Sequence, residues 1–421
     1  MVQTLEMQKP GVRSQESICL VCGKGIPVLF LDFGHTALAN NFLAAEDLNT
    51  PEPTYPLRVG FCRECGHVQL LDRVAPEEMF SNYLYVSSAS STLTAHLQSL
   101  ASAAVERFRL KPHDLVVDIG SNDGTLLSAF SSHGVRALGV DPAANLATLS
   151  RDKGIETVVD FFGVASAAAI CESHGLASVI TATNSFPHIP RLDSYLEGVR
   201  RLLAPEGTLV IEAHYLLDLL DQCAFDTIYH EHVSYWGLRS SQYLFRQHGL
   251  DLVDAERLPI HHGQIRMWVR HRGAGMVQPS VEQFLAQEHR HGVDRFETFE
   301  EFGCRVQRLK HQLRHTLADL KRAGDRIAGY GAPAKATTFL SFLELGPETL
   351  DYIADRSALK QGRYTPGSHI PIVSPEKLLA DQPDYVVVFA WNFIGEIAEQ
   401  LAPYRERGGR LIVPVPEVRF L

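Results

Sequence analysis

The stretch LVVDIGSNDGTLL, residues 115–127, constrains the fold more than any other part of this sequence. A short apolar run ending in Ile119 leads directly into the loop GSNDG and then into an apolar pattern with helical spacing. Strands that alternate with helices build a parallel sheet covered on both faces, with ligands at the carboxyl ends of its strands. We therefore predict a doubly wound α/β domain here, with further strands at residues 136–142, 156–160, 178–183 and 208–212.

The glycine loop after the first strand suits a ligand that is not held by its phosphates. Gly120 and Gly124 allow the backbone to approach a ligand closely, and Asp118 and Asp123 are hydrogen-bond acceptors. The phosphate-binding patterns G-x-G-x-x-G and G-x-x-x-x-G-K-[ST] do not occur in the loop. Asp141, after the next strand, can accept from both hydroxyls of a ribose. This combination favours a nucleoside-type ligand with a cationic amino-acid end.

Four of the seven cysteines form two CxxC pairs, Cys19 with Cys22 and Cys62 with Cys65. Two such pairs suit tetrahedral zinc, because each makes a tight knuckle that offers two sulfurs on one side. Iron or free thiols are the alternatives, and a disulfide framework is disfavoured in a reducing compartment. Because all four positions are cysteine, no position is left open for a catalytic water. We predict a structural zinc module at residues 16–75.

Length and charge narrow the possible partners. A chain of 421 residues exceeds what one hydrophobic core usually supports, so two or three domains are expected. The formal net charge of -10 disfavours non-specific nucleic-acid binding, which needs surplus lysine and arginine. No apolar run approaches the ~20 residues of a membrane span, and the first residues lack the apolar core of a signal peptide. We expect a cytoplasmic monomer or homodimer that binds neither nucleic acid nor membrane.

The remaining patterns suggest how the chain is divided. LDLVDAERL and QIRMWVRH, around residues 250–271, are expected to complete the middle sheet as an antiparallel pair. Near the C-terminus, RIAGYG, YIADR, YVVVFAW and RLIVPV read as the strands of a second, smaller α/β unit. The expected parts are a disordered lead-in at residues 1–15, the zinc module at 16–75, the α/β domain at 76–275, one or two linking helices at 276–323 and the second α/β domain at 324–421.

The segment TIYHEHVSYW, residues 227–236, gathers two histidines, a glutamate and two tyrosines. It is not a metalloprotease helix, because H-E-x-x-H requires a histidine where this sequence has serine. In an extended segment, His230 and His232 would share one side, with Tyr229 and Glu231 on the other. These residues are compatible with a metal site, a proton-transfer site or a polar loop, and the domain that carries them decides between these.

Several motifs together identify a family. The loop DIGSNDGT, the CxxC pairs, YVSSAS near residue 85, YHEH, GYGAPAK and KQGRYTPGSHIP occur in one order over nearly the whole chain. In this the sequence resembles the S-adenosylmethionine-dependent sugar C-methyltransferases, which methylate a nucleotide-linked 4-keto deoxysugar at C3. The resemblance implies a zinc-binding N-terminal domain, a Rossmann-like class I methyltransferase domain and a Rossmann-like C-terminal domain that grips the nucleotide. A dehydrogenase-type turn is the alternative for the glycine loop, and the missing G-x-G-x-x-G disfavours it.

The resemblance implies that S-adenosylmethionine binds along the carboxyl edge of the middle sheet. The aromatic residues after the third strand are candidates to line the adenine, although aromatics at a strand end are as often core. The residues expected to bind the cofactor are Asp118, Gly120, Asn122, Asp123, Gly124, Asp141, Asp160, Phe161 and Asn184.

The implied reaction assigns roles within the YHEH motif. Making a carbon nucleophile next to a ketone requires a base for the α-proton and a donor for the enolate oxygen. Because histidine titrates near neutrality, His232 is the expected general base. Tyr229 and Glu231 are expected to orient the base or bind the substrate, while His230 is expected to be structural. The family's further tyrosine best matches Tyr83, with the tyrosine two residues later as the alternate.

The acceptor implied by the resemblance is a nucleotide-diphosphate sugar, with thymidine as the expected nucleoside. The helix that follows RIAGYG offers an N-terminus near Lys335, and Lys360 and Arg363 could help to hold the diphosphate. Arg266 is a further candidate for substrate binding. The segment before it departs from the family's H-G-G-S at His262 and at the following Gln264, which leaves the sugar contacts open.

Three functional classes follow from these observations. The first is the sugar C-methyltransferase, which uses S-adenosylmethionine and carries Zn²⁺. The second is a zinc-containing O- or N-methyltransferase that acts on another small acceptor. The third is a binding scaffold without activity, which the intact tyrosine, glutamate and histidine of YHEH disfavour, because a scaffold needs no base.

Overall fold

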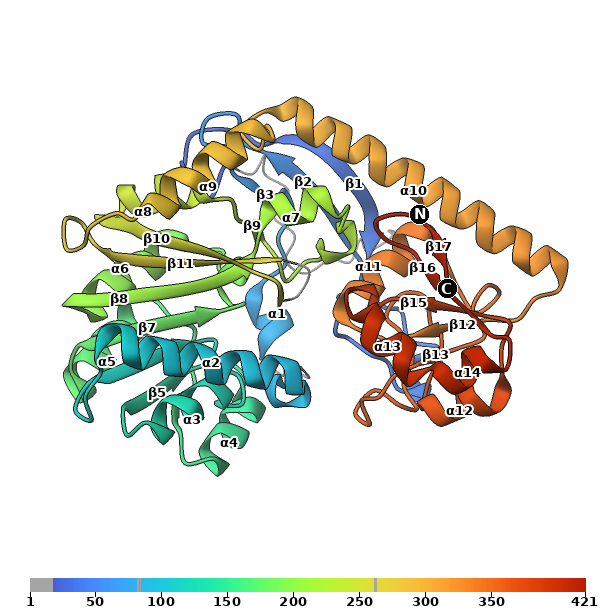
Figure 1. The fold of residues 1–421 in the computed structure, drawn as a ribbon, viewed down its shortest axis with the longest axis horizontal. Coiled ribbons are helices and arrows are strands. Elements are labelled where there is room, and N and C mark those ends of the chain that lie inside the picture. The colour runs from blue at the N-terminus through green and yellow to red at the C-terminus, as the bar shows by residue number, and fades with distance from the viewer. Residues whose placement is uncertain (1–17, 82, 84, 261–262) are drawn as a thin grey trace, which may run out of the picture.

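Three β-sheets organise the chain, for which a computed structural model describes residues 18–81, 83, 85–260 and 263–421. The expected disordered lead-in at residues 1–15 and the departure at His262 lie outside the described residues. In Figure 1 the middle domain lies on the left, the C-terminal domain on the right, and the zinc-module sheet above them. The fold is α/β with parallel-dominated sheets in both larger domains, as the sequence predicted.

The middle domain contains a seven-stranded sheet in the order β10-β11-β8-β7-β4-β5-β6. Only β11 runs antiparallel to the others, pairing with both β8 and β10, so the predicted antiparallel pair is confirmed. The strands are β4 (Leu115–Ile119), β5 (Arg136–Val140), β6 (Glu156–Val158), β7 (Ala177–Thr183), β8 (Leu203–His214), β10 (Leu250–Leu258) and β11 (Gln264–His271).

Helices cover both faces of this sheet because its strands are apolar on both sides. Val116 and Val179 pack into one core, and the adjacent Val117 and Ile180 pack into the other, as the two-residue period of a strand requires. The first core contains α2 (Ser91–Phe108) and α3 (Thr125–Ser132), and the second contains α5 (Val164–His174), α6 (Leu192–Leu202) and α8 (Leu238–Gln247).

The zinc module forms a four-stranded antiparallel sheet in the order β1-β2-β3-β9. Three strands come from the N-terminal region, β1 (Val28–Thr36), β2 (Tyr55–Phe61) and β3 (Val68–Leu70). The fourth, β9 (Ser234–Tyr235), belongs to the YHEH segment in the middle of the chain. The amide of Leu70 also donates to the carbonyl of Val233 at 3.0 Å. The zinc module therefore fixes the backbone that directly follows the YHEH motif.

The C-terminal domain has a six-stranded sheet in the order β14-β13-β12-β15-β16-β17, in which only β17 is antiparallel. All four strands predicted from the sequence are present. The elements are β12 (Ile327–Tyr330), α11 (Ala334–Leu343), β13 (Ile353–Ala354), β14 (Ile372–Val373), α12 (Pro375–Asp381), β15 (Tyr385–Val388), α13 (Ile394–Gln400), α14 (Ala402–Glu406), β16 (Arg410–Val413) and β17 (Arg419–Phe420).

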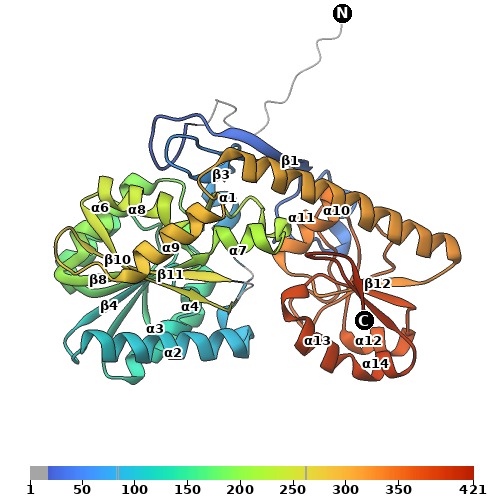
Figure 2. The same ribbon diagram turned by 45° about the horizontal axis from the view of Figure 1, so that its top comes forward.

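Two helices, α9 (Pro279–Arg290) and α10 (Phe296–Ala323), connect the two larger domains. Figures 1 and 2 show the 28-residue α10 running along the top of the molecule from the middle domain to the C-terminal domain. Its buried Phe299 stacks on Phe61 of β2, with ring centroids 4.6 Å apart. Within the described part of the chain, no helix has the length and apolarity needed to cross a bilayer.

Candidate active site

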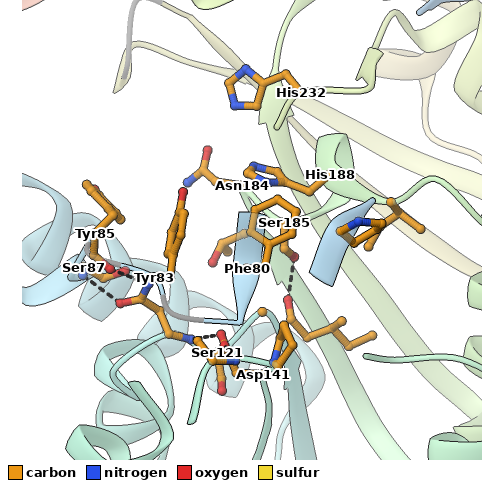
Figure 3. A pocket seen from close by; sticks show the side chains of 18 of the residues that line it. Phe80, Tyr83, Tyr85, Ser87, Ser121, Asp141, Asn184, Ser185, His188 and His232 are labelled. Carbon is orange, nitrogen blue, oxygen red and sulfur yellow. Dashed lines mark hydrogen bonds between the residues drawn. The ribbon is translucent and has the colours of Figure 1, made fainter. Parts of the chain in front are cut away.

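One cavity of about 1240 Å³ is lined by residues of all three domains. Asn40 of the zinc module, Asp141 of the middle domain and Lys335 of the C-terminal domain all face it. The cavity therefore joins the glycine loop, the YHEH segment and the start of α11. Figure 3 shows part of its lining, with Tyr83, His188 and His232 around the same space.

The glycine loop lines the cavity with backbone that no larger residue could replace. Gly120 and Gly124 have φ angles of 76° and 73°, which an L side chain rarely adopts. A Cβ atom at Gly120 would also lie 2.5 Å from the Cβ of Ser185, and one at Gly124 would lie 2.5 Å from the Oγ of Ser150. The loop therefore packs tightly against these two serines, and Gly120 lines the cavity whereas Gly124 is not among the described lining residues.

Asp141 follows β5 and lies beside the glycine loop. Its carboxylate accepts from the amides of Asn122 at 2.8 Å and Ala143 at 2.9 Å, and burial raises its pKa. A carboxylate has about four acceptor positions, so two ribose hydroxyls can still bind. The nearby Oγ of Ser121 is buried and has no hydrogen-bond partner among the described residues, although Ser121 lines the cavity. These polar atoms fit the nucleoside part of S-adenosylmethionine.

Asp118 near the end of β4 and Asp123 in the loop lie in different environments. Asp118 lines the cavity, accepts from the hydroxyl of Thr181 at 2.6 Å, and has its pKa raised to about 7 by burial. Asp123 is not among the described lining residues, because it pairs with Lys153 at 2.7 Å and accepts from Thr125. The other expected cofactor residues that face the cavity are Asn122, Asp160, Phe161 and Asn184.

A short segment crosses over the glycine loop and brings Tyr83 toward the YHEH motif. The side chain of Asn122 accepts from the amide of Ser87 at 2.9 Å and donates to the carbonyl of Tyr85 at 3.0 Å (Figure 3). Asn145 donates to the carbonyl of Tyr83 at 2.8 Å. These bonds tie the segment to the cofactor loop. Tyr83 thus lies between the glycine loop and the YHEH motif.

His232 is held in one tautomer by its two hydrogen bonds. Its Nδ1 lies 2.8 Å from the carbonyl oxygen of Thr227, which can only accept, so Nδ1 carries the hydrogen. The hydroxyl of Tyr229 then donates to Nε2 at 3.0 Å. Burial lowers the pKa of His232 to about 4, so the imidazole is neutral near pH 7. In this tautomer Nε2 carries a lone pair that can accept a proton, and His232 lines the cavity.

Glu231 is buried behind the cavity wall and receives donors from two other segments. Asn40 donates its Nδ2 to Oε1 at 2.6 Å, and the hydroxyl of Tyr83 donates to Oε2 at 2.7 Å. Burial raises the pKa of Glu231 to about 7 despite these donors. It is absent from the described residues that line the cavity. Its carboxylate is therefore placed to orient Tyr83 and Asn40.

The YHEH motif forms a turn, which corrects the extended arrangement expected from its sequence. The amide of His232 donates to the carbonyl of Tyr229 at 2.9 Å, and this turn brings the two side chains together. His230 is sent to the opposite side, where its Nε2 donates to the carbonyl of Pro56 at 3.3 Å. His230 therefore faces the zinc module, whereas His232 faces the cavity.

Two further histidines flank His232 and were missed from the sequence. The rings of His188 and His214 each lie with centroids 5.1 Å from that of His232, and both residues line the cavity. His214 ends β8, and His188 ends the short helix η3 (Phe186–His188) after β7. Their sequence signal was their place at the carboxyl ends of neighbouring strands, where a doubly wound sheet binds its ligands.

Two lysines form the cavity wall in the C-terminal domain. Lys335, in the first turn of α11, places Nζ 2.9 Å from Oδ1 of Asn392, 3.6 Å from Oδ2 of Asp226 and 4.0 Å from the centre of the Trp391 ring. Burial lowers the pKa of Lys335 to about 8. Lys360 donates to the carbonyl of Ala332 at 2.7 Å, and both lysines line the cavity.

Two arginines expected to bind substrate lie elsewhere among the described residues. Arg266, on β11, pairs with Glu212 on the neighbouring strand at 2.6 Å and with Glu256 at 2.9 Å. Arg363 donates to the carbonyl of Phe42 at 3.3 Å, where its loop contacts the zinc module. Neither arginine is among the described residues that line the cavity.

The four cysteines converge as a zinc site requires. Their sulfur atoms lie within 4.8 Å of one another, with Cys19 and Cys65 at 3.5 Å and Cys22 and Cys62 at 3.7 Å. Tetrahedral zinc with Zn–S bonds of about 2.3 Å would hold its sulfurs about 3.8 Å apart, so the four residues fit this metal. Within the residues that the structure describes, no other group of three or more metal-ligating side chains converges in this way.

Comparison with known proteins gives three consecutive family matches. Residues 19–80 match a family described as a zinc binding domain, residues 93–255 a methyltransferase domain, and residues 259–416 a C-methyltransferase C-terminal domain. The chain is 39% identical over 404 residues to C-methyltransferase NovU from Streptomyces niveus, and the match covers 96% of each protein.

Two of the solved structures that match this chain each cover less than half of it. An S-adenosylmethionine-dependent methyltransferase from Anabaena variabilis is 14% identical with a TM-score of 0.32, covering 48% of this chain and all of that one. Magnesium protoporphyrin IX methyltransferase from Synechocystis, with bound S-adenosylmethionine, is 12% identical with a TM-score of 0.31, covering 42% of this chain and 79% of that one. These TM-scores are too low to carry an argument, and the assignment rests on the family matches and on NovU.

The glycine loop fits S-adenosylmethionine, the cysteines fit zinc, and the three family matches follow one another along most of the chain. The chain therefore belongs to the S-adenosylmethionine-dependent C-methyltransferases that combine a zinc-binding domain, a methyltransferase domain and a C-methyltransferase C-terminal domain.

Proposed function

We propose that this C-methyltransferase acts on a nucleotide-linked 4-keto deoxysugar, with thymidine diphosphate as the nucleotide, and adds its methyl group at C3. The observation that carries the proposal is the single cavity that runs from the glycine loop past His232 to Lys335. A nucleotide-linked sugar has a reacting carbon at one end and a charged diphosphate further along. Going from the glycine loop toward the C-terminal domain, the cavity offers first a base, His232, and then a positively charged wall that includes Lys335.

The proposed reaction begins with removal of the α-proton. Nε2 of His232 takes the proton, and the C–H electron pair becomes the C=C bond of an enolate. The hydrogen bond from Tyr229 to Nε2 gives way as the substrate approaches, and its hydroxyl then donates to the enolate oxygen. S-adenosylmethionine, held beside Asp141 and the glycine loop, would supply an electrophilic methyl group for this carbon nucleophile and would leave as S-adenosylhomocysteine, with the electron pair of the broken bond on sulfur.

The buried surroundings of His232 support this role. An imidazole with a pKa near 4 is neutral in the working range, so its Nε2 keeps a lone pair for the proton, while the lowered pKa also makes it a weaker base than a free imidazole. The flanking His188 and His214 enclose it, and the low polarity around them strengthens the hydrogen bond to a developing enolate. Glu231 acts through Tyr83 and Asn40, because its carboxylate is bonded to both and lies behind the wall.

The C-terminal wall is proposed to hold the diphosphate. Lys335 and Lys360 supply charge, and the first turn of α11 supplies backbone amides that favour an anion. Lys335 is fixed in place by Asn392, Asp226 and Trp391, so it is preorganised before the substrate binds. The distance between the base and the two lysines would then determine which acceptors are long enough to place the reacting carbon at the base while the diphosphate is bound.

The test is to identify the product. The enzyme is incubated with S-adenosylmethionine and a panel of nucleotide-linked 4-keto and non-keto sugars, and products are analysed by mass spectrometry and carbon NMR. We expect S-adenosylhomocysteine and a sugar with a new carbon-bound methyl group at C3, from keto sugars only. A methyl group at C5, the other carbon next to the ketone, would overturn the position. A methyl group on oxygen, or turnover of non-keto sugars, would overturn the reaction.

A further inference from the structure

Arg73, just after β3 in the zinc-binding domain, lines the large cavity without a partner for part of its charge. Its Nη1 is buried and has no hydrogen-bond partner among the described residues. Burial lowers the pKa of the guanidinium, and no neighbouring carboxylate offsets that effect. Leaving a half-buried cation without a partner costs free energy, and a bound anion would offset that cost.

A second arginine of the same domain shows how such a charge is satisfied. Arg58 donates to both carboxylate oxygens of Asp72, through Nε at 2.7 Å and Nη2 at 2.8 Å. Asp72 is the residue directly before Arg73, yet its carboxylate is taken by the other arginine. Arg73 therefore keeps its charge unpaired among the described residues while it lines the cavity, and the part of its guanidinium that is not buried can donate to a phosphate or carboxylate there.

The two lysines of the C-terminal wall leave part of the charge of a bound diphosphate unbalanced, so a further cation would strengthen its binding. Lys335 has Asp226 beside it at 3.6 Å, and the negative charge of Asp355 acts on Lys360. Two positive charges are therefore matched by two negative ones before any ligand binds. A diphosphate diester carries two negative charges of its own. Arg191 also lines the cavity, but its side chain is exposed and already solvated by water.

We propose that Arg73 binds the diphosphate of the nucleotide-linked acceptor, which makes the zinc-binding domain part of the acceptor site. This inference rests on the proposed function, because it takes a nucleotide diphosphate as the ligand. It gives the zinc-binding domain a second role besides supporting the YHEH segment. The acceptor would then be held between Arg73 on one side and the lysines of the C-terminal domain on the other.

The test compares ligand affinities of Arg73→Gln and the wild-type enzyme by calorimetry, with thymidine diphosphate, thymidine and S-adenosylhomocysteine as probes. Loss of a charged hydrogen bond predicts about 10-fold to 100-fold weaker binding of thymidine diphosphate. Binding of thymidine and of S-adenosylhomocysteine should not change. The matched control is Arg63→Gln in the same domain, whose exposed guanidinium lies over the ring of Phe296, outside the cavity lining, and which should bind all probes normally.

The outcomes separate this inference from the proposed function. If wild-type enzyme binds no nucleoside diphosphate, whether of thymidine, uridine or guanosine, the proposed acceptor class is wrong. If wild type binds thymidine diphosphate and Arg73→Gln binds it equally well, only the role of Arg73 is wrong. Weaker binding of S-adenosylhomocysteine alone would show that the methionine carboxylate is the partner, and would also overturn the inference. Should Arg73→Gln not fold, Arg73→Met keeps the aliphatic stem and repeats the measurement.

Discussion

The two ends of the cavity are assembled in different ways. At the cofactor end, the lining residues lie at or directly after the carboxyl ends of strands of one sheet, from Asp118 near the end of β4 to Asn184 after β7. At the acceptor end, Asn40, His232 and Lys335 come from three different domains. The cofactor end therefore depends on local backbone geometry, whereas the acceptor end depends on how the domains fit together.

Glu231 illustrates the consequence of this difference. Both of its side-chain donors come from outside the YHEH segment, Asn40 from the zinc-binding domain and Tyr83 from the segment over the glycine loop. By contrast, the amides that hold Asp141 lie within the same domain and close along the chain. Substitutions at the two ends should therefore separate methyl-donor binding from turnover.

The largest effect is expected at the acceptor end. His232→Ala should lower turnover by ~10²–10⁴, the usual contribution of a general base, while S-adenosylhomocysteine binds normally. Glu231→Gln should cause a smaller loss, because the base itself remains. The control is His230→Gln, in the same motif, whose side chain faces Pro56 and should leave turnover nearly unchanged. Full activity of His232→Ala together with an inactive Glu231→Gln would make the carboxylate the base.

The second-largest effect is expected from a substitution at the cofactor end. Asp141→Asn should weaken binding of S-adenosylmethionine by about 1.5–3 kcal/mol, because the charged acceptor for two ribose hydroxyls is lost. Affinity for thymidine diphosphate should stay the same. Calorimetry measures both, and Asp152→Asn, on the exposed end of α4 (Ala144–Asp152), serves as the control. Unchanged cofactor affinity would contradict the assignment of this end.

A smaller effect should connect the zinc-binding domain to catalysis. Asn40→Ala removes the 2.6 Å hydrogen bond to Glu231, which predicts about a tenfold loss of kcat with unchanged cofactor affinity. Because an amide donor favours the ionised carboxylate, its loss should also raise the pKa of Glu231. The small pH dependence that the ionisation of Glu231 imposes on kcat should therefore shift to higher pH in the variant. A profile that stays in place would indicate that Asn40 has only a structural role.

The smallest effect is expected in the pH profile of the wild-type enzyme. With its pKa lowered to about 4, His232 stays neutral and able to accept a proton as pH rises from about 5. Glu231, with its pKa raised to about 7, changes from neutral to ionised across the neutral range. If His232 is the base, kcat/KM should change by less than about tenfold between about pH 6 and pH 8. A rise of about tenfold per pH unit below pH 7 would instead point to Glu231.

The difference between local geometry at the cofactor end and contacts between domains at the acceptor end also explains what could be predicted from the sequence. The strands and the paired cysteines follow short local patterns, and these predictions are confirmed, while the cofactor contacts expected of the glycine loop stay a prediction. The contact between Asn40 and Glu231 spans 191 positions, and no local pattern marks it. Arg266 was expected to bind substrate, but strand register sets it directly opposite Glu212, which takes its charge. Long-range pairing, including that of β9 with the zinc module, requires the folded structure.

The central claim is that His232 removes the proton next to the ketone in a step that precedes methyl transfer. The most direct test is to incubate the enzyme with the keto sugar and S-adenosylhomocysteine in heavy water, and to follow deuterium at the α-carbon by NMR. Methyl transfer cannot occur, so exchange reports proton removal alone. We expect the wild-type enzyme and His230→Gln to exchange this proton and His232→Ala to leave it in place. Exchange by His232→Ala at the wild-type rate would contradict the account.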